Sequence, residues 1–518
     1  MLETRLDRRR FLAGTAIAGS ALLLRPGWAW SADGDTLTVR AAGDIAVLDP
    51  AFQAGMIEEE VNRCVLVSLI RLNDVRDKVG WTLHAASEMK QLDPTAIAFT
   101  LRDGLRWSGD WGPVTAEDVK FSFERVASPE MKSPWSYAFE AMDHVEVKDA
   151  KSGIIRLKQP STPFWYTTLP YYMGHIVCKK AVEKAGGKYT TEVPATCGAY
   201  HIETWNPKQN LTLVANPDWK GEPVAFKTVK FQIIEDTDAA GLAYEAKSVD
   251  YTRISLNTLA AYKKTPPAAT KVIDMPTSRF VWLSINVANP KLGDPKVRQA
   301  IQYALRTQDI LDGAYSGLAG PATGVVPPGM LGHRDQILYA PDPEKAKALL
   351  KEAGVSDLSL QLAVLNDATS KLTAQVMQAE LAEIGINLDI KTYDDAVYWT
   401  LGDKTAGDGW KSLELVLMGF NGGVDPSENL TWFRPDQIGV WNWSQFDSKE
   451  YEQLYQDGAR ESDPARREAI YRKMQDLMEE SGGFVFITHE VFAAVHRDSI
   501  AVTVLADDYL DIPRTRRV

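Results

Sequence analysis

The sequence contains few of the residues that build metal and redox sites: it has three cysteines and seven histidines in 518 residues. No two cysteines form a CxxC pattern, which excludes a zinc ribbon and a thioredoxin-like redox motif. The histidines are scattered, without the i, i+3 or i+4 spacing that places two metal ligands on one helix face. We therefore expect neither a metal site nor a cofactor.

An excess of basic residues is also lacking, because 57 Lys and Arg stand against 69 Asp and Glu, for a formal net charge of −12. No basic stripe is present, so a nucleic-acid partner is excluded. Because 45% of the residues are hydrophobic, a mostly disordered chain is excluded too. The length predicts about two to four domains.

Long apolar runs are missing apart from residues 13–24, a run too short and too rich in glycine for a transmembrane helix. Arg8 and Arg9 precede it, and Ala29 begins a small-x-small site after it. This pattern is typical of a secretory signal, and the paired arginines resemble a twin-arginine signal. We expect residues 1–31 to be removed and the mature protein to lie in the periplasm. A basic amphipathic helix at a cytosolic N-terminus is the alternative.

Enzyme motifs are absent as well: the sequence has no GxSxG, HExxH, GxxxxGK[ST] or GxGxxG. Acidic neighbours such as Glu58 and Glu59, or Asp394 and Asp395, would have to converge on one sugar for glycosidase chemistry, and adjacent residues rarely do so. A binding protein is favoured, with a secreted hydrolase such as a glycosidase as the alternative.

Helix and strand patterns interleave from end to end. Strand alternation is found at 36–40, 99–102, 229–234, 386–390 and 484–488. Helices are predicted over 58–72, 115–126, 294–305, 342–354, 372–383 and 463–481. An Asp-Pro pair opens three of these helices, as N-cap and first helical residue. The order predicts an α/β fold with mixed sheets.

Tryptophan is abundant, with 15 in the chain. Between positions 399 and 443, aromatic residues alternate with glycines and amides, a composition that suits a pocket that stacks on a ligand and orients it by hydrogen bonds. For any one of these residues a place in the core is the alternative; for the cluster we predict a pocket wall. Its aromatic members are Trp399, Trp410, Phe420, Trp432, Phe433, Trp441 and Trp443.

Several further motifs follow one another in a fixed order. They are Leu48-Asp49-Pro50, residues 99–107 (FTLRDGLRW), residues 115–122 (TAEDVKFS), Cys197-Gly198-Ala199-Tyr200, Ser284-Ile285-Asn286, residues 297–304 and residues 344–354. With these motifs the sequence resembles the extracytoplasmic solute-binding proteins of ATP-binding-cassette importers, of the oligopeptide, dipeptide and nickel type (family 5).

This resemblance implies a two-lobed periplasmic-binding-protein clamp with an extra inserted domain. Lobe one would comprise residues 32–73, 189–275 and 484–518, the inserted domain 74–188, and lobe two 276–483. Such receptors enclose a solute between their lobes, which shifts them toward a closed form that docks on a membrane permease. They carry out no chemistry and hold no cofactor, and we expect a monomer.

The resemblance also bears on the ligand. Peptide-binding members hold the ligand's α-amine with an aspartate at the position of Gly422, and some dipeptide binders hold its carboxylate with an arginine in a segment that here, at 365–370, has none. Because a buried charge without a partner is costly, opine-like and oligosaccharide ligands compete with peptide-like ones. The predicted ligand contacts are Gln53 from lobe one and Asn366, Asp367, Phe420, Asn421, Asp425, Trp432, Trp441 and Asn442 from lobe two.

An oxidising compartment permits disulfides. Cys178 and Cys197 bracket a short glycine-rich stretch, and we predict a bridge between them. Cys64 lies in an apolar run and is predicted to be a buried free thiol.

Overall fold

A computed structural model describes residues 34–53, 55–73 and 79–518. The predicted signal segment, residues 1–31, lies outside this part of the chain. Within it, no helix combines the length and the apolar character needed to cross a membrane.

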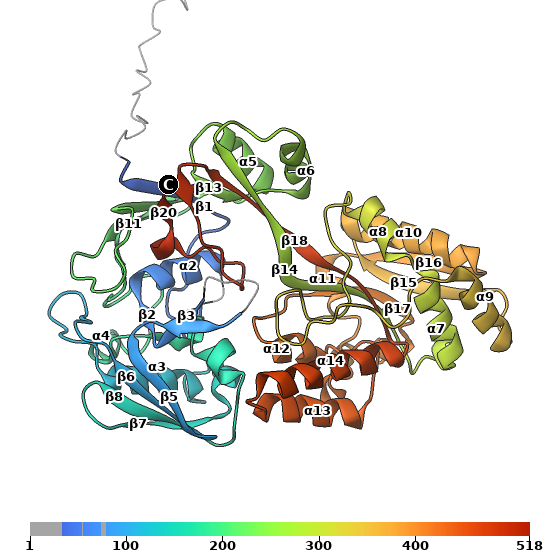
Figure 1. The fold of residues 1–518 in the computed structure, drawn as a ribbon, viewed down its shortest axis with the longest axis horizontal. Helices are drawn as coiled ribbons and strands as arrows, with labels where there is room; N and C mark the ends of the chain where they lie inside the picture. The colour runs from blue at the N-terminus through green and yellow to red at the C-terminus, as the bar shows by residue number, and fades with distance from the viewer. Residues whose placement is uncertain (1–33, 54, 74–78) are drawn as a thin grey trace, which may run out of the picture.

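One ten-stranded mixed sheet runs through the molecule (Figure 1). In spatial order its strands are β10 (Tyr200–Asn206), β11 (Asn210–Ala215), β12 (Thr228–Ile233), β1 (Thr36–Ala41), β13 (Tyr251–Arg253), β18 (Phe484–Arg497), β14 (Thr270–Ile285), β17 (Leu415–Phe420), β15 (Leu358–Leu365) and β16 (Ile386–Tyr393). We call the part of the molecule around β10 to β13 lobe one, and the part around β15 to β17 lobe two.

Two long strands, β14 and β18, join the lobes (Figure 1). The last turn of the ladder in lobe one pairs β13 with residues 494–496 of β18, whereas β17 pairs with residues 280–285 of β14. Between these regions, from Pro276 to Phe280, the register of β14 against β18 shifts. Such an irregularity bends a strand locally, and here it lies where the chain passes from one lobe to the other.

A second, antiparallel sheet of four strands lies in the predicted inserted domain. Its strands are β5 (Ala86–Asp93), β6 (Ala96–Leu101), β8 (Ser152–Leu157) and β7 (Met142–Val147). Helix α3 (Ala116–Ala127) packs against this sheet and starts with the predicted capping box, in which Thr115 and Asp118 satisfy each other's backbone N–H groups. We call residues 79–188 the inserted domain below; the exact lobe boundaries stay a prediction.

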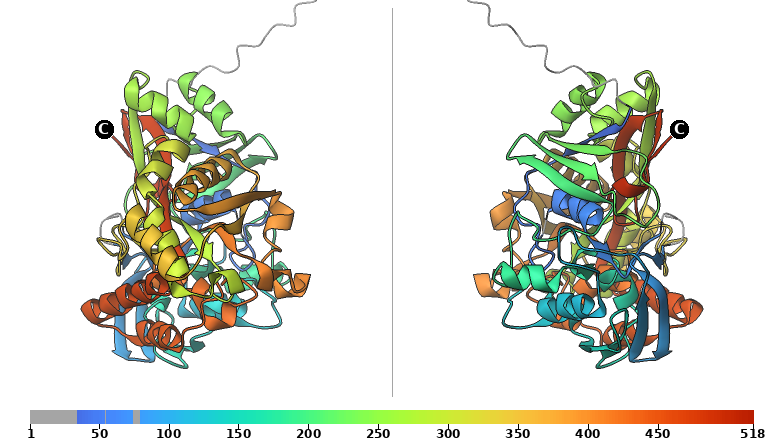
Figure 2. Two further views of the ribbon diagram at one scale, coloured as in Figure 1. Left: turned by 90° about the vertical axis from the view of Figure 1, so that its right-hand side faces the viewer. Right: turned by 90° about the vertical axis from the view of Figure 1, so that its left-hand side faces the viewer.

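Lobe two has a hydrophobic core on each face of its sheet, as the alternation of a strand requires. Val281, Leu283 and Ile285 of β14 pack on one side, while Phe280 and Trp282 pack on the other. The helices of this lobe are α7 (Pro295–Ala304), α8 (Thr307–Ala314), α9 (Pro343–Glu352), α10 (Ala368–Glu383), α11 (Asp395–Tyr398), α12 (Pro426–Leu430), α13 (Lys449–Arg460) and α14 (Pro464–Glu480). The four-stranded sheet of the inserted domain and helices α13 and α14 lie at the same end of the molecule (Figure 2).

The three helices predicted from Asp-Pro pairs are confirmed. The side chains of Asp294, Asp342 and Asp463 each accept a backbone N–H at the start of α7, α9 and α14. The remaining helices are α4 (Lys179–Lys184), α5 (Thr237–Glu245) and α6 (Leu256–Lys264).

The helix predicted over residues 58–72 is wrong in its second half. Helix α2 (Met56–Val65) ends early, and two short strands follow, β2 (Val67–Ser68) and β3 (Ile70–Leu72). They pair with β9 (His175–Ile176) and β4 (Trp81–Leu83). Residues 64–70 are all buried, so their apolar character reflects burial on every side and not a helix face.

Candidate ligand-binding site

The aromatic residues expected to gather do form one cluster, centred on Phe420 at the end of β17. The ring centroid of Phe420 lies 5.5 Å from that of Trp432, 5.7 Å from Trp441 and 6.1 Å from Trp399. Trp443 joins at 6.3 Å from Trp399. The cluster covers the aromatic face of the lobe-two sheet, where Trp282 stacks against Phe280.

Exposure divides this cluster into a floor and a rim. Phe280 and Trp282 are buried, as is Phe420, whereas Trp432 and Trp441 are half-buried. The indole nitrogen of Trp432 is itself buried and has no hydrogen-bond partner among the described residues. The rim therefore offers planar surface and one unused N–H donor.

The loop after β17 carries two glycines that are packed under side chains of α12. A β-carbon on Gly422 would stand 2.4 Å from Asn429 Nδ2, and one on Gly423 would stand 1.5 Å from Glu428 Oε2. Asn429 Oδ1 accepts the N–H of Gly423 at 3.2 Å. Gly422 is tied to β14, because its N–H donates to the carbonyl of Ser278 at 3.1 Å. An aspartate at position 422 has no room beside Asn429.

Asp425 is not available to a ligand, which corrects its predicted role. Its carboxylate caps α12 by accepting the N–H of Ser427 at 3.0 Å. It also forms a bidentate ion pair with Arg467, with N–O distances of 2.7 and 2.9 Å, and both side chains are buried. Its hydrogen-bonding capacity is taken up inside lobe two.

Two predicted amide contacts are corrected for the same reason. Asn442 is buried, and its amide donates to the carbonyls of Phe433 and Phe446 at 3.1 and 2.8 Å, which fixes the surrounding loop. Gln53 is buried in lobe one, donates to Glu59 Oε2 at 2.7 Å and accepts from Asn62.

The predicted polar contacts at the other edge of lobe two are exposed. Asn366 donates to Asp394 Oδ1 at 3.0 Å, and Asp367 caps α10 by accepting the N–H of Ser370 at 2.9 Å. Asn421 is exposed and accepts from Arg279 Nη1 at 3.4 Å. Of these three, Asn421 adjoins the aromatic cluster through its neighbour Phe420.

Sequence reasoning did not single out Arg279, a half-buried cation in the irregular segment between the lobes. Its Nε lies 2.8 Å from Glu490 Oε1, and its guanidinium lies within 2.9 Å of where a β-carbon on Gly419 would stand. A basic residue directly before the apolar run of β14 was the available signal.

Glu428 was also overlooked. It belongs to α12, is half-buried, and its Oε2 atom is buried without a hydrogen-bond partner among the described residues. Burial and the charge of Asp425 raise the pKa of Glu428 to about 8, against the lowering effect of hydrogen bonds from the backbone of Val424 and Asp425. A carboxyl with such a pKa is mostly neutral near pH 7.

Aromatic residues of the inserted domain face Glu428 from across the lobes. Trp135 packs edge-on against Tyr137 and Tyr172, with ring centroids 6.2 and 4.8 Å apart, and Tyr171 lies beside Tyr172. The pKa values of these three tyrosines are raised by burial and, further, by the nearby carboxyl of Glu428. The doublets Trp135/Tyr137 and Tyr171/Tyr172 are visible in the sequence.

The lobes touch on both sides of this region. Val424, in the glycine loop of lobe two, packs with Leu72 and Leu505 of lobe one. In the inserted domain, the backbone N–H and the hydroxyl of Thr162 donate to the carbonyls of Ala459 and Glu461, at 2.9 and 2.8 Å. Glu428 and the tyrosines are thus placed where the lobes meet.

Lobe one adds a buried charge network next to this junction. Arg63 pairs with Glu59 at 2.5 Å and with Asp507, and His175 Nε2 lies 3.2 Å from Glu59 Oε2. Burial alone would raise the pKa of Glu59, but Arg63 and His175 lower it to about 2. These charges compensate one another, and the network supports the wall that carries Tyr509, whose ring Arg63 covers at 5.0 Å.

The predicted disulfide is not formed in the structure. Cys178 and Cys197 are buried free thiols, as is Cys64. Burial raises the pKa of both Cys178 and Cys197. Cys197 is fixed by its N–H, which donates to the carbonyl of Val65 at 2.9 Å, and Cys178 precedes α4 as its N-cap residue.

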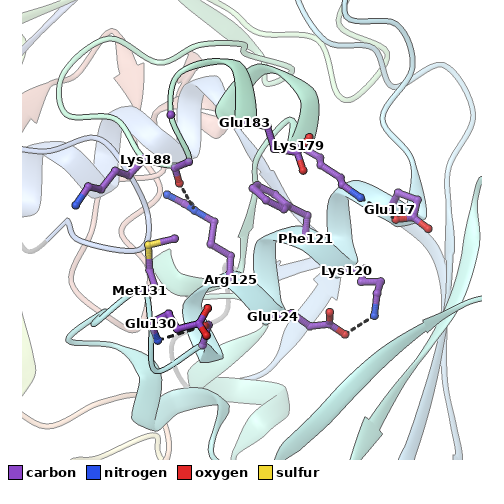
Figure 3. A pocket seen from close by; sticks show the side chains of 13 residues that line it. Glu117, Lys120, Phe121, Glu124, Arg125, Glu130, Met131, Lys179, Glu183 and Lys188 are labelled. Atoms are coloured by element: carbon purple, nitrogen blue, oxygen red, sulfur yellow. Dashed lines mark hydrogen bonds and ion pairs between the residues drawn. The ribbon is translucent and has the colours of Figure 1, made fainter.

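A separate hollow of about 580 Å³ lies on the inserted domain, between α3 and the chain around α4 (Figure 3). Its charged side chains are largely paired with one another or with backbone: Lys120 with Glu124 at 2.6 Å, Lys179 with Glu117 at 3.4 Å, and Arg125 with the carbonyl of Gly187 at 3.0 Å. None of the predicted contacts lines it, and we do not assign the ligand to it.

Comparison with known proteins agrees with this architecture. Residues 83–437 match the model of the bacterial extracellular solute-binding proteins, family 5. The dipeptide-binding protein of Escherichia coli is 28% identical over 447 residues, covering 78% of this chain and 80% of the relative. The glutathione-binding protein GsiB of Salmonella typhi is 27% identical over 489 residues, covering 90% and 91%.

Among solved structures, HbpA2 from Haemophilus parasuis superimposes with a TM-score of 0.84 at 21% identity, covering 93% of this chain and all of that one. The fold and site define a two-lobed solute-binding receptor. The chain belongs to the family 5 extracellular solute-binding proteins, the receptors of ATP-binding-cassette importers, as the resemblance in its motifs predicted.

Proposed function

We propose that this receptor binds a peptide-like solute between its lobes and delivers it to the permease of an ATP-binding-cassette importer. The observation that carries the proposal is the pair of aromatic walls: Trp432 and Trp441 on lobe two, and Trp135 and Tyr137 on the inserted domain. Walls of this kind suit an extended solute with an apolar backbone and side chains. The names of the dipeptide- and glutathione-binding relatives support a peptide-like ligand.

Of the predicted contacts, we retain Phe420, Asn421, Trp432 and Trp441, and we add Arg279. Arg279 supplies the cation that the segment 365–370 lacks, at the edge of the same aromatic cluster. An acidic end of a solute placed there would share the guanidinium with Glu490 and Asn421. This supports peptide-like ligands over neutral oligosaccharides, which need no such charge.

The setting of the receptor follows the N-terminal sequence. We infer export to the periplasm through the twin-arginine route, from Arg8 and Arg9. Export of an Arg8→Lys, Arg9→Lys double variant by that route would contradict this. We also infer that the receptor works as a monomer.

The function is tested by thermal unfolding of the mature protein in the presence of three ligand sets: mixed di- to pentapeptides, opines and oligosaccharides. A bound solute raises the melting temperature by mass action, by an amount that grows with its concentration. We expect a rise with the peptide set. A rise with the oligosaccharides alone would overturn the peptide assignment, and turnover of any of them would revive the hydrolase alternative.

A further inference from the structure

The carboxyl group of Glu428 is an unused acid at the junction of the lobes. Its Oε2 atom is buried and has no hydrogen-bond partner in the described part of the chain. A buried polar atom without a partner costs free energy, so native structures rarely keep one unless something else satisfies it. The structure therefore holds an acceptor whose partner is not a residue described here.

The position of this acceptor is fixed by local structure. Glu428 is the third residue of α12, and the backbone N–H groups of Val424 and Asp425 hydrogen-bond to its carboxyl, in the manner of a capping box. Gly423 lacks the β-carbon that would collide with Oε2. The carboxyl is held by its capping contacts, while Oε2 stays unpaired above the glycine loop.

The surroundings of Oε2 suit a cation. Tyr137, Tyr171 and Tyr172 of the inserted domain are close enough for the charge of Glu428 to raise their pKa values. Tyr137 is 63% exposed even though surrounding protein raises its pKa, so its ring borders open space next to the junction. Tyrosine faces attract ammonium groups, and most strongly where water is excluded.

The other acids near Glu428 are already neutralised. Asp425 is paired with Arg467, and Asp507 with Arg63. A cation that enters between the lobes therefore finds Glu428 as the acid with a free oxygen. This distinguishes Glu428 from a cluster of surface carboxylates.

We propose that Glu428 binds a protonated amine of the solute and is the residue that selects for amine-bearing ligands. The proposal rests on the peptide-like function proposed above and deepens it. When the ammonium group settles against Oε2, the neutral carboxyl loses its proton to solvent and an ammonium–carboxylate pair forms. The amine keeps its own proton, so the step is a proton release coupled to binding.

The test uses two probes: a mixture of di- to pentapeptides without arginine, and the same mixture with every amine acetylated. Binding is followed by calorimetric titration of the mature protein. We expect acetylation to weaken binding by roughly 100-fold, the loss that follows when one partner of a buried ion pair is removed. A third mixture, acetylated at the amino termini with lysine side chains free, shows which kind of amine is bound.

Glu428→Gln is the diagnostic variant, because glutamine preserves the capping contacts. It should weaken binding of the free-amine mixture to the level of the acetylated one. Glu380→Gln is the matched control: Glu380 is also a buried glutamate, with a pKa raised by burial to about 7, but it faces Arg306 on the outer helices of lobe two. The control should bind both mixtures as the wild type does.

A second measurement needs no variant. Titration at pH 7 in two buffers of different ionisation enthalpy should show release of more than half a proton when the free-amine mixture binds, and little release with Glu428→Gln. Equal binding of free and acetylated peptides, or no proton release, overturns the role of Glu428 and leaves the peptide receptor standing. Failure of every peptide mixture to bind overturns the proposed function and the inference with it.

Discussion

Arg467 of α14 holds Asp425 at the start of α12 by two parallel hydrogen bonds, 2.7 and 2.9 Å long, inside lobe two. The sequence motif around Asp425-Pro426 predicted a ligand contact, but the ion pair consumes both carboxylate oxygens. What the pair does is fix α12, and with it the residues that α12 presents to the lobe junction.

Asp425→Asn should therefore destabilise the fold more than it disturbs the ligand. Removing the acid leaves the Arg467 guanidinium buried without its counter-charge, which costs roughly 3–5 kcal/mol of unfolding free energy. Asp367→Asn is the control, because Asp367 is an exposed N-cap of α10 whose replacement by asparagine costs little. Chemical denaturation measures both; equal stability of the two variants would show that the Asp425–Arg467 pair is not structural.

Gly423→Ala should move the side chain of Glu428, because the added β-carbon would stand 1.5 Å from Oε2. The displaced carboxyl breaks its contacts with the backbone of α12, and we expect weaker peptide binding with a modest loss of melting temperature. Gly409→Ala is the control, since a β-carbon there meets nothing within 4 Å. If Gly423→Ala binds peptides as the Gly409→Ala variant does, the glycine is not needed to seat Glu428.

The stability of the ligand-free protein should carry the signature of Glu428. Burial raises the pKa of its carboxyl from 4.5 to about 8, so the folded protein keeps this proton in a range where the unfolded chain releases it. Its contribution to the unfolding free energy is complete below pH 4.5 and is lost as the pH rises toward about 8. The titratable and charged groups around it are Asp425, Asp507, Tyr137, Tyr171, Tyr172 and Tyr455, with Arg467 and Arg63 paired to the two acids.

Thermal melts of the wild type and Glu428→Gln between pH 4.5 and 9 measure this contribution. The wild type should lose stability relative to the variant up to about pH 8, and the two curves should run parallel above that value. For the control Glu380→Gln, the divergence from the wild type should stop near pH 7, where Glu380 ionises. Parallel curves for wild type and Glu428→Gln over the whole range would mean that Glu428 is not held in its neutral form.

Thiol counting on denatured, unreduced protein should find three free cysteines. Cys64, Cys178 and Cys197 are all unbridged in the structure. Their burial shields them, so the count before denaturation should be lower than three. A count of one after denaturation would restore the bridge between Cys178 and Cys197.

Much of the fold could be predicted because its signals are local. Aspartate-proline pairs mark where α7, α9 and α14 begin, and Gly354, Gly385 and Gly482, all with positive φ, mark where α9, α10 and α14 end. The aromatic cluster was also foreseeable, since its members lie within one stretch of chain. The prediction of α2 failed where uniform burial hid the change from helix to strand.

The polar part of the site could not be predicted in the same way. Whether Asp425, Asn442 or Gln53 is free depends on Arg467, Phe446 and Asn62, partners that the fold supplies. The importance of Glu428 arises from the approach of Tyr137 and Tyr171, almost three hundred residues earlier in the chain. A single sequence does not show such encounters.

Native mass spectrometry of the protein purified from its own host, as wild type, Trp441→Ala and Trp410→Ala, tests the central claim most directly. Trp441 lies on the rim of the aromatic cluster, whereas Trp410 belongs to the same stretch of sequence but packs outside it, beside Lys411. Loss of a buried aromatic anchor should weaken binding by roughly 1–3 kcal/mol. We predict a retained peptide-like solute on the wild type and Trp410→Ala, and its loss from Trp441→Ala. A retained solute that is not peptide-like, or equal retention by all three proteins, would contradict the assignment of a peptide site between the lobes.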